Sequence, residues 1–329
     1  MKPAGAILLM TLSCAAGAAH AAEDTPAPRA WSVAGRGEAI VVTDGGKPVL
    51  QYQLKKPADV QLPVDSGGYF HPVMTPAGVV VTDVAPADHR HHRGIFLAWV
   101  EMHGKKDADF WGWGEHAPIK DRRIVNQPHM ANRATPGGGS FATRNHWTAE
   151  GQTVLSEQIE AAVRHDGPAK AYVIDLTYTL TPDADLTLSR WAFSGFCVRT
   201  RGDGKVTAFG PDGEVTLPNP SHVKPESDWP DAAWYGYSLK FDDGKTAGVA
   251  VINHPRNPPT LWHNHRDIRM LNPCVVAPGE VKLKANEPLV LKYRVVAHDG
   301  ETPGKALDKL AEEWREGDKE TRGQGERAK

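Results

Sequence analysis

The chain has 329 residues, with 38 Lys and Arg, 40 Asp and Glu, and a formal net charge of −2 at pH 7. A balance this close to neutral, with no basic run before the C-terminal tail, argues against nucleic acid as a partner. After the first 21 residues no apolar stretch approaches the ~18 residues of a membrane-spanning helix, so we expect no membrane association of the mature chain.

The N-terminus has the pattern of a secretory signal peptide. Lys2 precedes the short apolar run 6–10, and Ala19-His20-Ala21 forms an A-x-A cleavage site. We therefore predict a signal peptide at residues 1–21, a flexible leader at residues 22–30, and a periplasmic or secreted location.

Cleavage of the signal peptide removes Cys14 and leaves Cys197 and Cys274. An exported protein is able to pair them, but two cysteines far apart in sequence make no disulfide framework. Pairing and two buried thiols remain equal alternatives.

Short segments with strand signals follow one another along most of the mature chain. The predicted strands are Glu38–Thr43, Val49–Leu54, Gly78–Asp83, Gly94–Glu101, Ser140–Thr148, Thr153–Val163, Ala171–Thr181, Leu186–Arg190, Phe193–Thr200, Trp234–Phe241, Thr246–Ile252, Glu280–Lys284 and Leu289–Ala297. The clearest is Ala171–Thr181, where apolar and polar residues alternate with the period of two of a strand on a core. The stretch Gly202–Trp229, rich in Pro, Gly and Asp, is predicted to be a loop over one face.

One helix is predicted near the C-terminus, at Pro303–Trp314. Thr302 is able to cap it, and Leu307, Leu310 and Trp314 share one of its faces. The charged tail at residues 317–329 is predicted to be disordered. The sequence therefore predicts an all-β fold: a large single-domain antiparallel β-sandwich, residues 31–316, with one C-terminal helix.

Two imidazoles stand at i, i+2 in His89-Arg90-His91. On extended backbone they point to one side, as in many β-sandwich metal sites, whereas His92 points to the other. The glutamate that a cupin has a few residues later is absent, because Ile95-Phe96-Leu97 stands there. No cofactor is therefore predicted outright. A divalent metal held by His89 and His91 stays open beside the alternative that these histidines bind sugar hydroxyls.

Acid–base chemistry is the second hypothesis for this stretch. His92 or His89 would move a proton, Arg93 would stabilise an anionic oxygen, and Asp88 would orient one of the rings. The alternative is a structural salt bridge between Asp88 and Arg93. Among the carboxylates, Glu115 is the best placed for acid–base work.

A second polar cluster lies at residues 254–267, after the strand predicted at Thr246–Ile252. Loops that carry His, Trp, Arg and Asp together are usually functional. We predict that His254, Trp262 and His263 of this loop line one pocket with His71 and the segment His89–Arg93. Trp111, Trp113 and Trp262 would be platforms for sugar rings, with core packing as the alternative.

Three motifs resemble a known family. Phe70–Gly78, Asp88–Trp99 and Asp109–Gly112 are similar to the PmoA-type family, a domain of unknown function whose label refers to methane oxygenase. Members of that family tend to be exported and to occur beside proteins that act on 3-keto glycosides, so the resemblance implies carbohydrate chemistry. The methane label disagrees with the sequence, because such a membrane subunit needs several spans of about 20 apolar residues.

These observations lead to a prediction of an exported carbohydrate-active protein. The first hypothesis is a lyase or hydrolase that cleaves or isomerises a glycoside or an oxidised (keto) sugar by His and Arg acid–base chemistry. The alternatives are a non-catalytic sugar-binding protein and a metal-dependent oxygenase, as the family label implies.

Overall fold

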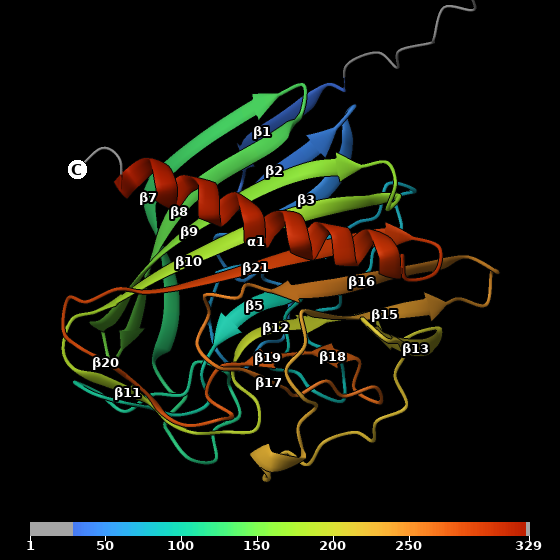
Figure 1. Ribbon diagram of the computed structural model, residues 1–329. Helices are drawn as coiled ribbons and strands as arrows, with labels where there is room; N and C mark the ends of the chain where they lie inside the picture. The colour runs from blue at the N-terminus through green and yellow to red at the C-terminus, as the bar shows by residue number, and fades with distance from the viewer. Residues whose placement is uncertain (1–28, 327–329) are drawn as a thin grey trace, which may run out of the picture.

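The computed structural model describes residues 29–326, which form two large antiparallel β-sheets and one α-helix (Figure 1). The predicted signal peptide, and the leader as far as residue 28, lie outside the described residues. The prediction of an all-β, sandwich-like fold with a C-terminal helix is confirmed.

The first sheet has seven strands in the order β1-β2-β3-β4-β5-β12-β18. They are β1 (Trp31–Arg36), β2 (Ala39–Asp44), β3 (Lys47–Gln53), β4 (Tyr69–Val73), β5 (Ile95–Ala98), β12 (Gly195–Arg199) and β18 (Met270–Leu271). The histidine-rich segment His89–Arg93 leads directly into β5, which pairs with β12.

The second sheet has nine strands in the order β14-β13-β15-β16-β21-β10-β9-β8-β7. They are β7 (Arg122–Thr135), β8 (Gly138–Ala149), β9 (Gln152–Asp166), β10 (Ala171–Pro182), β13 (Lys205–Gly210), β14 (Gly213–Glu214), β15 (Trp234–Lys240), β16 (Thr246–Asn253) and β21 (Leu289–Asp299). Part of the stretch predicted to be a loop, Gly202–Trp229, thus supplies β13 and β14 at one edge.

Two smaller sheets lie among the loops. β6 (Met102–His103), β11 (Leu186–Leu188) and β20 (Val281–Leu283) form one, and β17 (Leu261–Trp262) with β19 (Pro273–Cys274) forms the other. A short 3-10 helix at Pro225–Ser227 immediately precedes Asp228.

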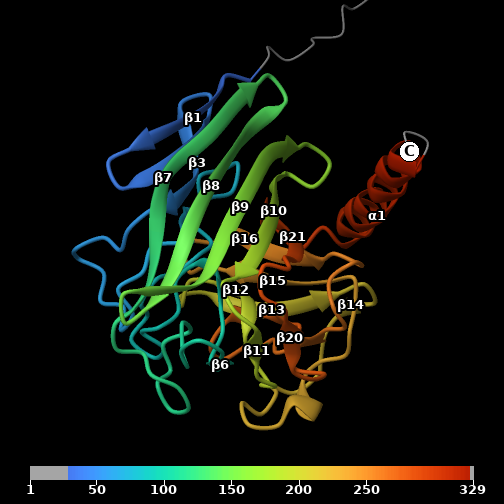
Figure 2. The same ribbon diagram turned by 90° about the vertical axis from the view of Figure 1, so that its left-hand side faces the viewer.

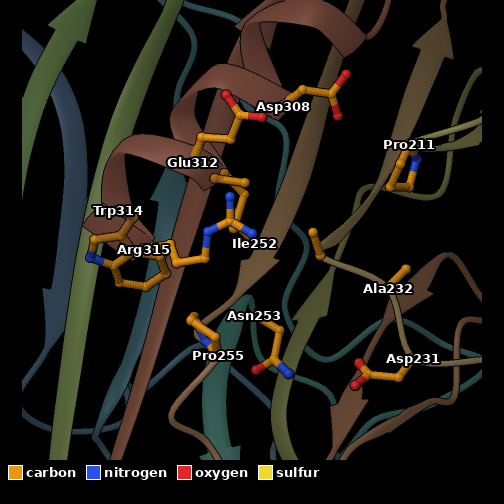
Figure 3. A pocket seen from close by; sticks show the side chains of 12 residues that line it. Pro211, Asp231, Ala232, Ile252, Asn253, Pro255, Asp308, Glu312, Trp314 and Arg315 are labelled. Carbon is orange, nitrogen blue, oxygen red and sulfur yellow. The ribbon is translucent and has the colours of Figure 1, made fainter. Parts of the chain in front are cut away.

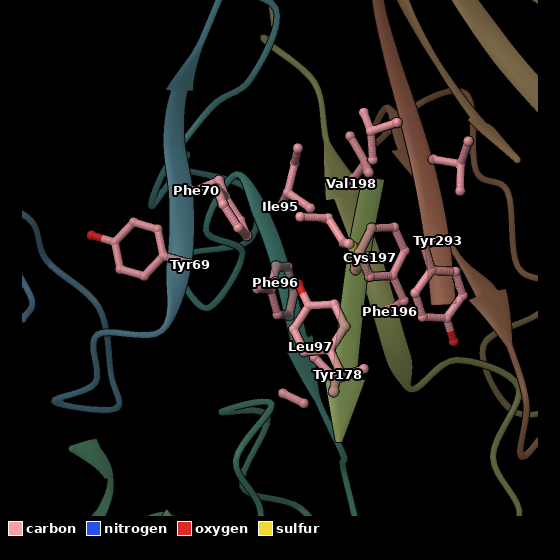
Figure 4. Close-up of a cluster of buried hydrophobic side chains, with 14 of the residues drawn as sticks. Tyr69, Phe70, Ile95, Phe96, Leu97, Tyr178, Phe196, Cys197, Val198 and Tyr293 are labelled. Carbon is pink, nitrogen blue, oxygen red and sulfur yellow. The ribbon is translucent and has the colours of Figure 1, made fainter. Parts of the chain in front are cut away.

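The main core lies between the two large sheets. In β10, the apolar side chains predicted to face the core are buried, namely Tyr172, Ile174, Leu176, Tyr178 and Leu180. Figure 4 shows Tyr178 beside Phe196 and Cys197 of β12 and Tyr293 of β21. The rings of Phe196 and Tyr293 stack with their centroids 4.1 Å apart, which joins the two sheets. Cys197 and Cys274 are both buried free thiols and are not paired.

Helix α1 (Gly304–Glu326) covers the other face of the nine-stranded sheet (Figures 1 and 2). Leu307 and Leu310 are buried there in a separate apolar cluster with Val173 and Val296, and Trp314 packs against that cluster. The predicted face of the helix is therefore confirmed. Its predicted end at Trp314 is wrong, because the helix continues to Glu326.

A carboxyl group is buried in the core between the sheets. Glu157 of β9 is 3% exposed, and its Oε2 accepts a hydrogen bond of 2.6 Å from Nε1 of Trp147. Nearby, Asn145 donates to the hydroxyl of Tyr52 at 2.7 Å. Burial raises the pKa of Glu157 to about 7, since the desolvated carboxylate is disfavoured.

This carboxyl group makes stability depend on pH. Its folded-state pKa of about 7 lies above the ordinary value of 4.5, so Glu157 favours the folded state at low pH. The contribution is lost as the pH rises between these two values, and the difference corresponds to roughly 3 kcal/mol. The glutamine of Glu157→Gln cannot ionise, so the variant does not lose this contribution. The free energy of unfolding of the variant minus that of the wild type should therefore increase by roughly 2–3 kcal/mol from pH 5 to pH 8. Urea unfolding at both pH values measures this, and a constant difference between the two proteins would refute it.

Candidate functional site

The three histidines of the segment His89–His92 lie in a turn. The backbone N–H of His92 donates to the carbonyl of His89 at 2.9 Å, and that of Ala85 donates to the carbonyl of His92 at 2.8 Å. The ring centroids of His89, His91 and His92 are 4.6–5.6 Å apart. The predicted extended backbone, with His91 and His92 on opposite sides, is therefore wrong. In a turn the period of two does not apply, and all three rings gather on one side.

These rings form part of the wall of a cavity of about 240 Å³. The lining residues come from five separate segments of the chain and are His89, His91, His92, Trp113, Phe193, His222, His263, His265, Ile268 and Met270. His263 and His265 lie in the connection between β17 and β18. The structure thus brings the two histidine-rich segments, more than 160 positions apart, to one cavity.

One lining histidine is bonded to a buried carboxyl group. Nδ1 of His263 lies 2.7 Å from Oδ1 of Asp228, and both side chains are almost fully buried. Burial raises the pKa of Asp228 to about 8 and lowers that of His263 to about 3, because a dry environment disfavours charge on either group. When the pair holds a single proton between Oδ1 and Nδ1, Nε2 of His263 carries a lone pair, as a general base requires.

An ion pair of Arg199 and Asp88 lies behind the part of the cavity wall that His92 forms. Arg199 of β12 donates to both carboxylate oxygens of Asp88 at 2.8 Å, and its Nη1 lies 3.3 Å from Nδ1 of His92. Asp88 therefore pairs with Arg199, and the alternative salt bridge to Arg93 is not formed. Asp88 Oδ2 also lies 3.2 Å from Nδ1 of His89. The predicted acid–base segment is thus held by an arginine from another strand.

Burial keeps several of the cavity imidazoles neutral. It lowers the pKa of His91 to about 3 and that of His265 to about 4, and neighbouring histidines and arginines lower the first further. Among the described lining residues none is Asp, Glu, Lys or Arg. The wall therefore offers neutral donors and acceptors together with aromatic surface.

The aromatic part of the wall depends on Asp109. Its carboxylate accepts backbone N–H bonds from Gly112 and Gly114, both at 2.7 Å, and the side chain is fully buried. Both glycines have positive φ, at 99° and 81°, which the tight turn requires. This turn places Trp113 against Phe193, with ring centroids 4.8 Å apart, at the cavity wall.

Besides Asp88, two predicted catalytic residues, Arg93 and Glu115, do not line the cavity. Arg93 is 1% exposed and is directed into the protein, where it donates to the carbonyls of His91, Phe110 and Trp111 and stacks on Phe96. Its role in stabilising an anionic oxygen is therefore corrected to a structural one. Glu115 is exposed and lies 3.6 Å from His116 on the surface.

Four predicted binding residues also lie elsewhere. Trp111 and Trp262 are fully buried, so the alternative of core packing holds for both. His71 lies next to Thr82, 3.0 Å from its hydroxyl, and His254 packs on Trp314 of α1. The predicted residues that do line the cavity are His89, His91, His92, His263 and Trp113, one of the three predicted platforms.

The sequence does not indicate several residues that complete the site. Asp228 and His222 stand alone in a proline-rich stretch, without a partner at a recognisable spacing. Arg199 lies in a strand whose five residues are all buried, so it resembles a core position. Phe193 is predicted only as part of a strand. No local pattern identifies these residues, because each meets its partner across the fold.

A metal is the remaining question for the histidines. Within residues 29–326, no group of three or more His, Cys, Asp or Glu side chains is placed to hold a metal ion. Among the described residues, His89 and His91, the pair considered for a divalent metal, therefore have no third side chain in a position to bind the same ion.

A larger cleft of about 600 Å³ lies between α1 and the end of β16 (Figure 3). Asp231, Asp308, Glu312 and Arg315 project toward it, but no histidine lines it. Asp308 is already bonded to Nε1 of Trp234 at 2.8 Å. The cleft has no general base comparable to His263.

In the described part of the chain, no helix is long and apolar enough to cross a membrane.

Comparison with solved structures gives only distant similarities. One is to a Glycoside Hydrolase Family 97 enzyme from Pseudoalteromonas sp. strain K8, in complex with acarbose, at 9% identity and a TM-score of 0.37. It covers 84% of this chain and 34% of that enzyme, so the chain spans about a third of its length. Another is to the Slr1438 protein from Synechocystis sp. PCC 6803, at 9% identity and a TM-score of 0.34, covering 84% and 99%. At these TM-scores the likeness assigns no activity.

Comparison of sequences gives one clear result. A search of curated proteins finds no match. The family model that matches is that of a family of unknown function, DUF6807, over residues 39–312. The resemblance to the PmoA-type family is therefore wrong, and the methane label has no support.

Proposed function

Since the chain belongs to the family of unknown function DUF6807, whose name states no activity, we propose from its own residues that it is a carbohydrate-active enzyme. In this proposal the histidine-lined cavity binds a small neutral sugar, and His263 moves a proton on it. The observation that carries the proposal is the buried pair of Asp228 and His263, 2.7 Å apart, at the cavity wall.

The lining supports a carbohydrate as the ligand. Neutral imidazoles donate and accept hydrogen bonds, as sugar hydroxyls require, and Trp113 and Phe193 supply apolar surface for C–H groups. A phosphorylated or carboxylated ligand would need a cation, and no Lys or Arg is among the described lining residues. The volume of about 240 Å³ is below the roughly 300–1,000 Å³ of typical ligand pockets, so it suits one small molecule.

The carboxyl groups indicate the class of reaction. Glycoside hydrolysis usually uses two carboxyl groups on opposite sides of the scissile bond. Here no carboxylate is among the described lining residues, and Asp228 stands behind His263. A single histidine base suits removal of a proton from carbon next to a carbonyl group instead.

The step balances with the groups present. The C–H bond next to the carbonyl breaks, its proton passes to Nε2 of His263, and its electron pair forms a C=C bond as the carbonyl becomes an enolate oxygen. Isomerisation follows when His263 returns the proton to the former carbonyl carbon. The adjacent hydroxyl then loses its proton to the enolate oxygen, and the electrons of that O–H bond form the new carbonyl group. Alternatively, the enolate expels a group one carbon further along and the proton leaves with that group, which is elimination. Asp228 stabilises the imidazolium that forms.

Proton exchange tests the proposal on many candidate sugars at once, so the substrate need not be identified first. Purified protein in D2O is incubated with a panel of neutral aldoses, ketoses and keto glycosides, and loss of the C–H signal is followed by NMR. The wild type should exchange the proton next to the carbonyl of at least one sugar, and His263→Gln should be slower by about a hundredfold or more.

His103→Gln is the matched control. Its imidazole also lies beside carboxylates, 2.6 Å from Glu101 and 3.0 Å from Asp107, but it does not line the cavity. This variant should exchange at the wild-type rate. Sugar binding without exchange by the wild type would refute catalysis and identify a binding protein, and absence of both would refute the carbohydrate ligand.

A further inference from the structure

We infer that Arg199 is a positioning residue that fixes His92 as a hydrogen-bond donor toward the cavity through Nε2. The site would then recognise a carbonyl oxygen of the ligand with His92 while His263 takes the proton. The identification of that oxygen as a carbonyl rests on the proposed function, whereas the state of His92 follows from the geometry alone.

The geometry leaves one assignment for the hydrogen on His92. Nη1 of Arg199 lies 3.3 Å from Nδ1 of His92, and a guanidinium group has donors but no acceptor. Nδ1 must therefore accept this bond with its lone pair. A neutral imidazole with an unprotonated Nδ1 carries its hydrogen on Nε2.

The surroundings prevent the ring from becoming a cation. His92 is 2% exposed, and the rings of His89 and His91 lie next to it, with centroids 4.9 and 4.6 Å away. A proton on Nδ1 would point at the guanidinium of Arg199. Burial and these neighbours hold the pKa of His92 well below its usual value.

Arg199 is itself held in a fixed orientation. Its side chain is 3% exposed, and Nη2 donates to both oxygens of Asp88, each at 2.8 Å, which leaves Nη1 to bond His92. Nη2 and Nη1 lie in one rigid plane, so the guanidinium group holds Asp88 with one nitrogen and His92 with the other, which a single lysine ammonium cannot reproduce. Asp88 thus acts on the cavity through Arg199, although Asp88 itself does not line it.

The cavity then presents two different nitrogen atoms to a ligand. Nε2 of His263 offers a lone pair in the deprotonated pair with Asp228, and Nε2 of His92 offers a hydrogen. Neutral imidazole is an effective donor to a carbonyl oxygen that becomes an enolate, because it does not have to give up a full proton. The ligand class is accordingly a neutral sugar with a free carbonyl group, in its open-chain or oxidised form.

NMR of the imidazole nitrogens tests the assignment without any substrate. Protein labelled with ¹⁵N in histidine is compared with His92→Gln, which identifies the signals of His92. The wild type should show a pyrrole-type Nε2 and a pyridine-type Nδ1 at neutral pH. A protonated Nδ1, alone or in an imidazolium, would overturn the inference whatever the activity of the protein.

Variants then separate Arg199 from a general structural role. In Arg199→Met and Arg199→Lys the preference of His92 for the Nε2–H form should be lost, and deuterium exchange should fall by about tenfold to a hundredfold. Asp88→Asn, at a side chain that is 44% exposed, should weaken the same preference if the buried variants do not fold. An unchanged His92 signal in all folded variants would overturn the role of Arg199.

Arg201→Met is the matched control. Arg201 is also paired with an aspartate, Asp203, but it does not line the cavity. The His92 signals should be unchanged in this variant. If no sugar exchanges with the wild type while His92 shows the Nε2–H form, the proposed function fails and the inference about Arg199 stands.

Discussion

Replacing Asp228 with asparagine is expected to lower the rate of sugar C–H exchange by about a thousandfold or more while the fold is preserved. The amide of asparagine is able to donate to Nδ1 of His263, which transfers the ring hydrogen to Nε2 and removes the lone pair that faces the ligand. NMR exchange rates in D2O measure the loss. Asp107→Asn is the control, because Asp107 pairs with His103 at 3.0 Å outside the cavity and should leave the rate unchanged.

The same variant should change the dependence of the rate on pH. Burial raises the pKa of Asp228 to about 8, so the pair gives up its extra proton as the pH rises through that value. The form with a free lone pair is present above about pH 8 and is lost below it. The wild-type kcat/KM should therefore rise with pH and level off above about 8, and Asp228→Asn should lack this limb. A wild-type rate independent of pH between 6 and 9 would contradict the assignment of the base.

Gly94→Ala is expected to cost roughly 3 kcal/mol or more of folding stability. Gly94 has φ of 59°, and a Cβ at this position would lie 2.1 Å from the carbonyl oxygen of Phe70 and 3.0 Å from Cβ of His71. Strand β4 would have to move away from the turn that carries His92. The free energy of unfolding in urea gives the size of the effect.

Gly78→Ala separates the two causes of this loss. Gly78 also has positive φ, 81°, but a Cβ there would meet no atom within 4 Å. It should lose only the roughly 1–2 kcal/mol of the left-handed backbone. Equal losses in the two variants would show that the contact with β4 relaxes at no cost.

The sequence predicts the parts of the fold in which local pattern and burial agree. The alternation in β10 indicates its inward face correctly, and the spacing of Leu307 and Leu310 indicates the contact face of α1. β7 is not predicted, because its sequence RRIVNQPHMANRAT does not alternate and contains Pro128. It is an edge strand, and edge strands tolerate both features.

The sequence indicates the region of the site better than its members. Both segments that form the cavity are rich in histidine. Such a composition is rare in segments whose only role is core packing, so it indicates a site. The inward direction of Arg93 depends on carbonyls of residues 110 and 111, which no local pattern reveals. The pairing of Asp228 with His263 joins residues 35 positions apart across a loop, so only the folded chain shows it.

The uncharged lining of the cavity also determines how a ligand would reach it. Charged clefts draw in ions from a distance and lose that advantage as salt is added. Here the described lining has no carboxylate, ammonium or guanidinium group, and Asp88 and Arg199 behind it neutralise each other. Encounter with a neutral sugar would therefore proceed by unsteered diffusion, at a rate independent of ionic strength. Added salt should therefore leave the rate of binding of a neutral ligand to this cavity unchanged.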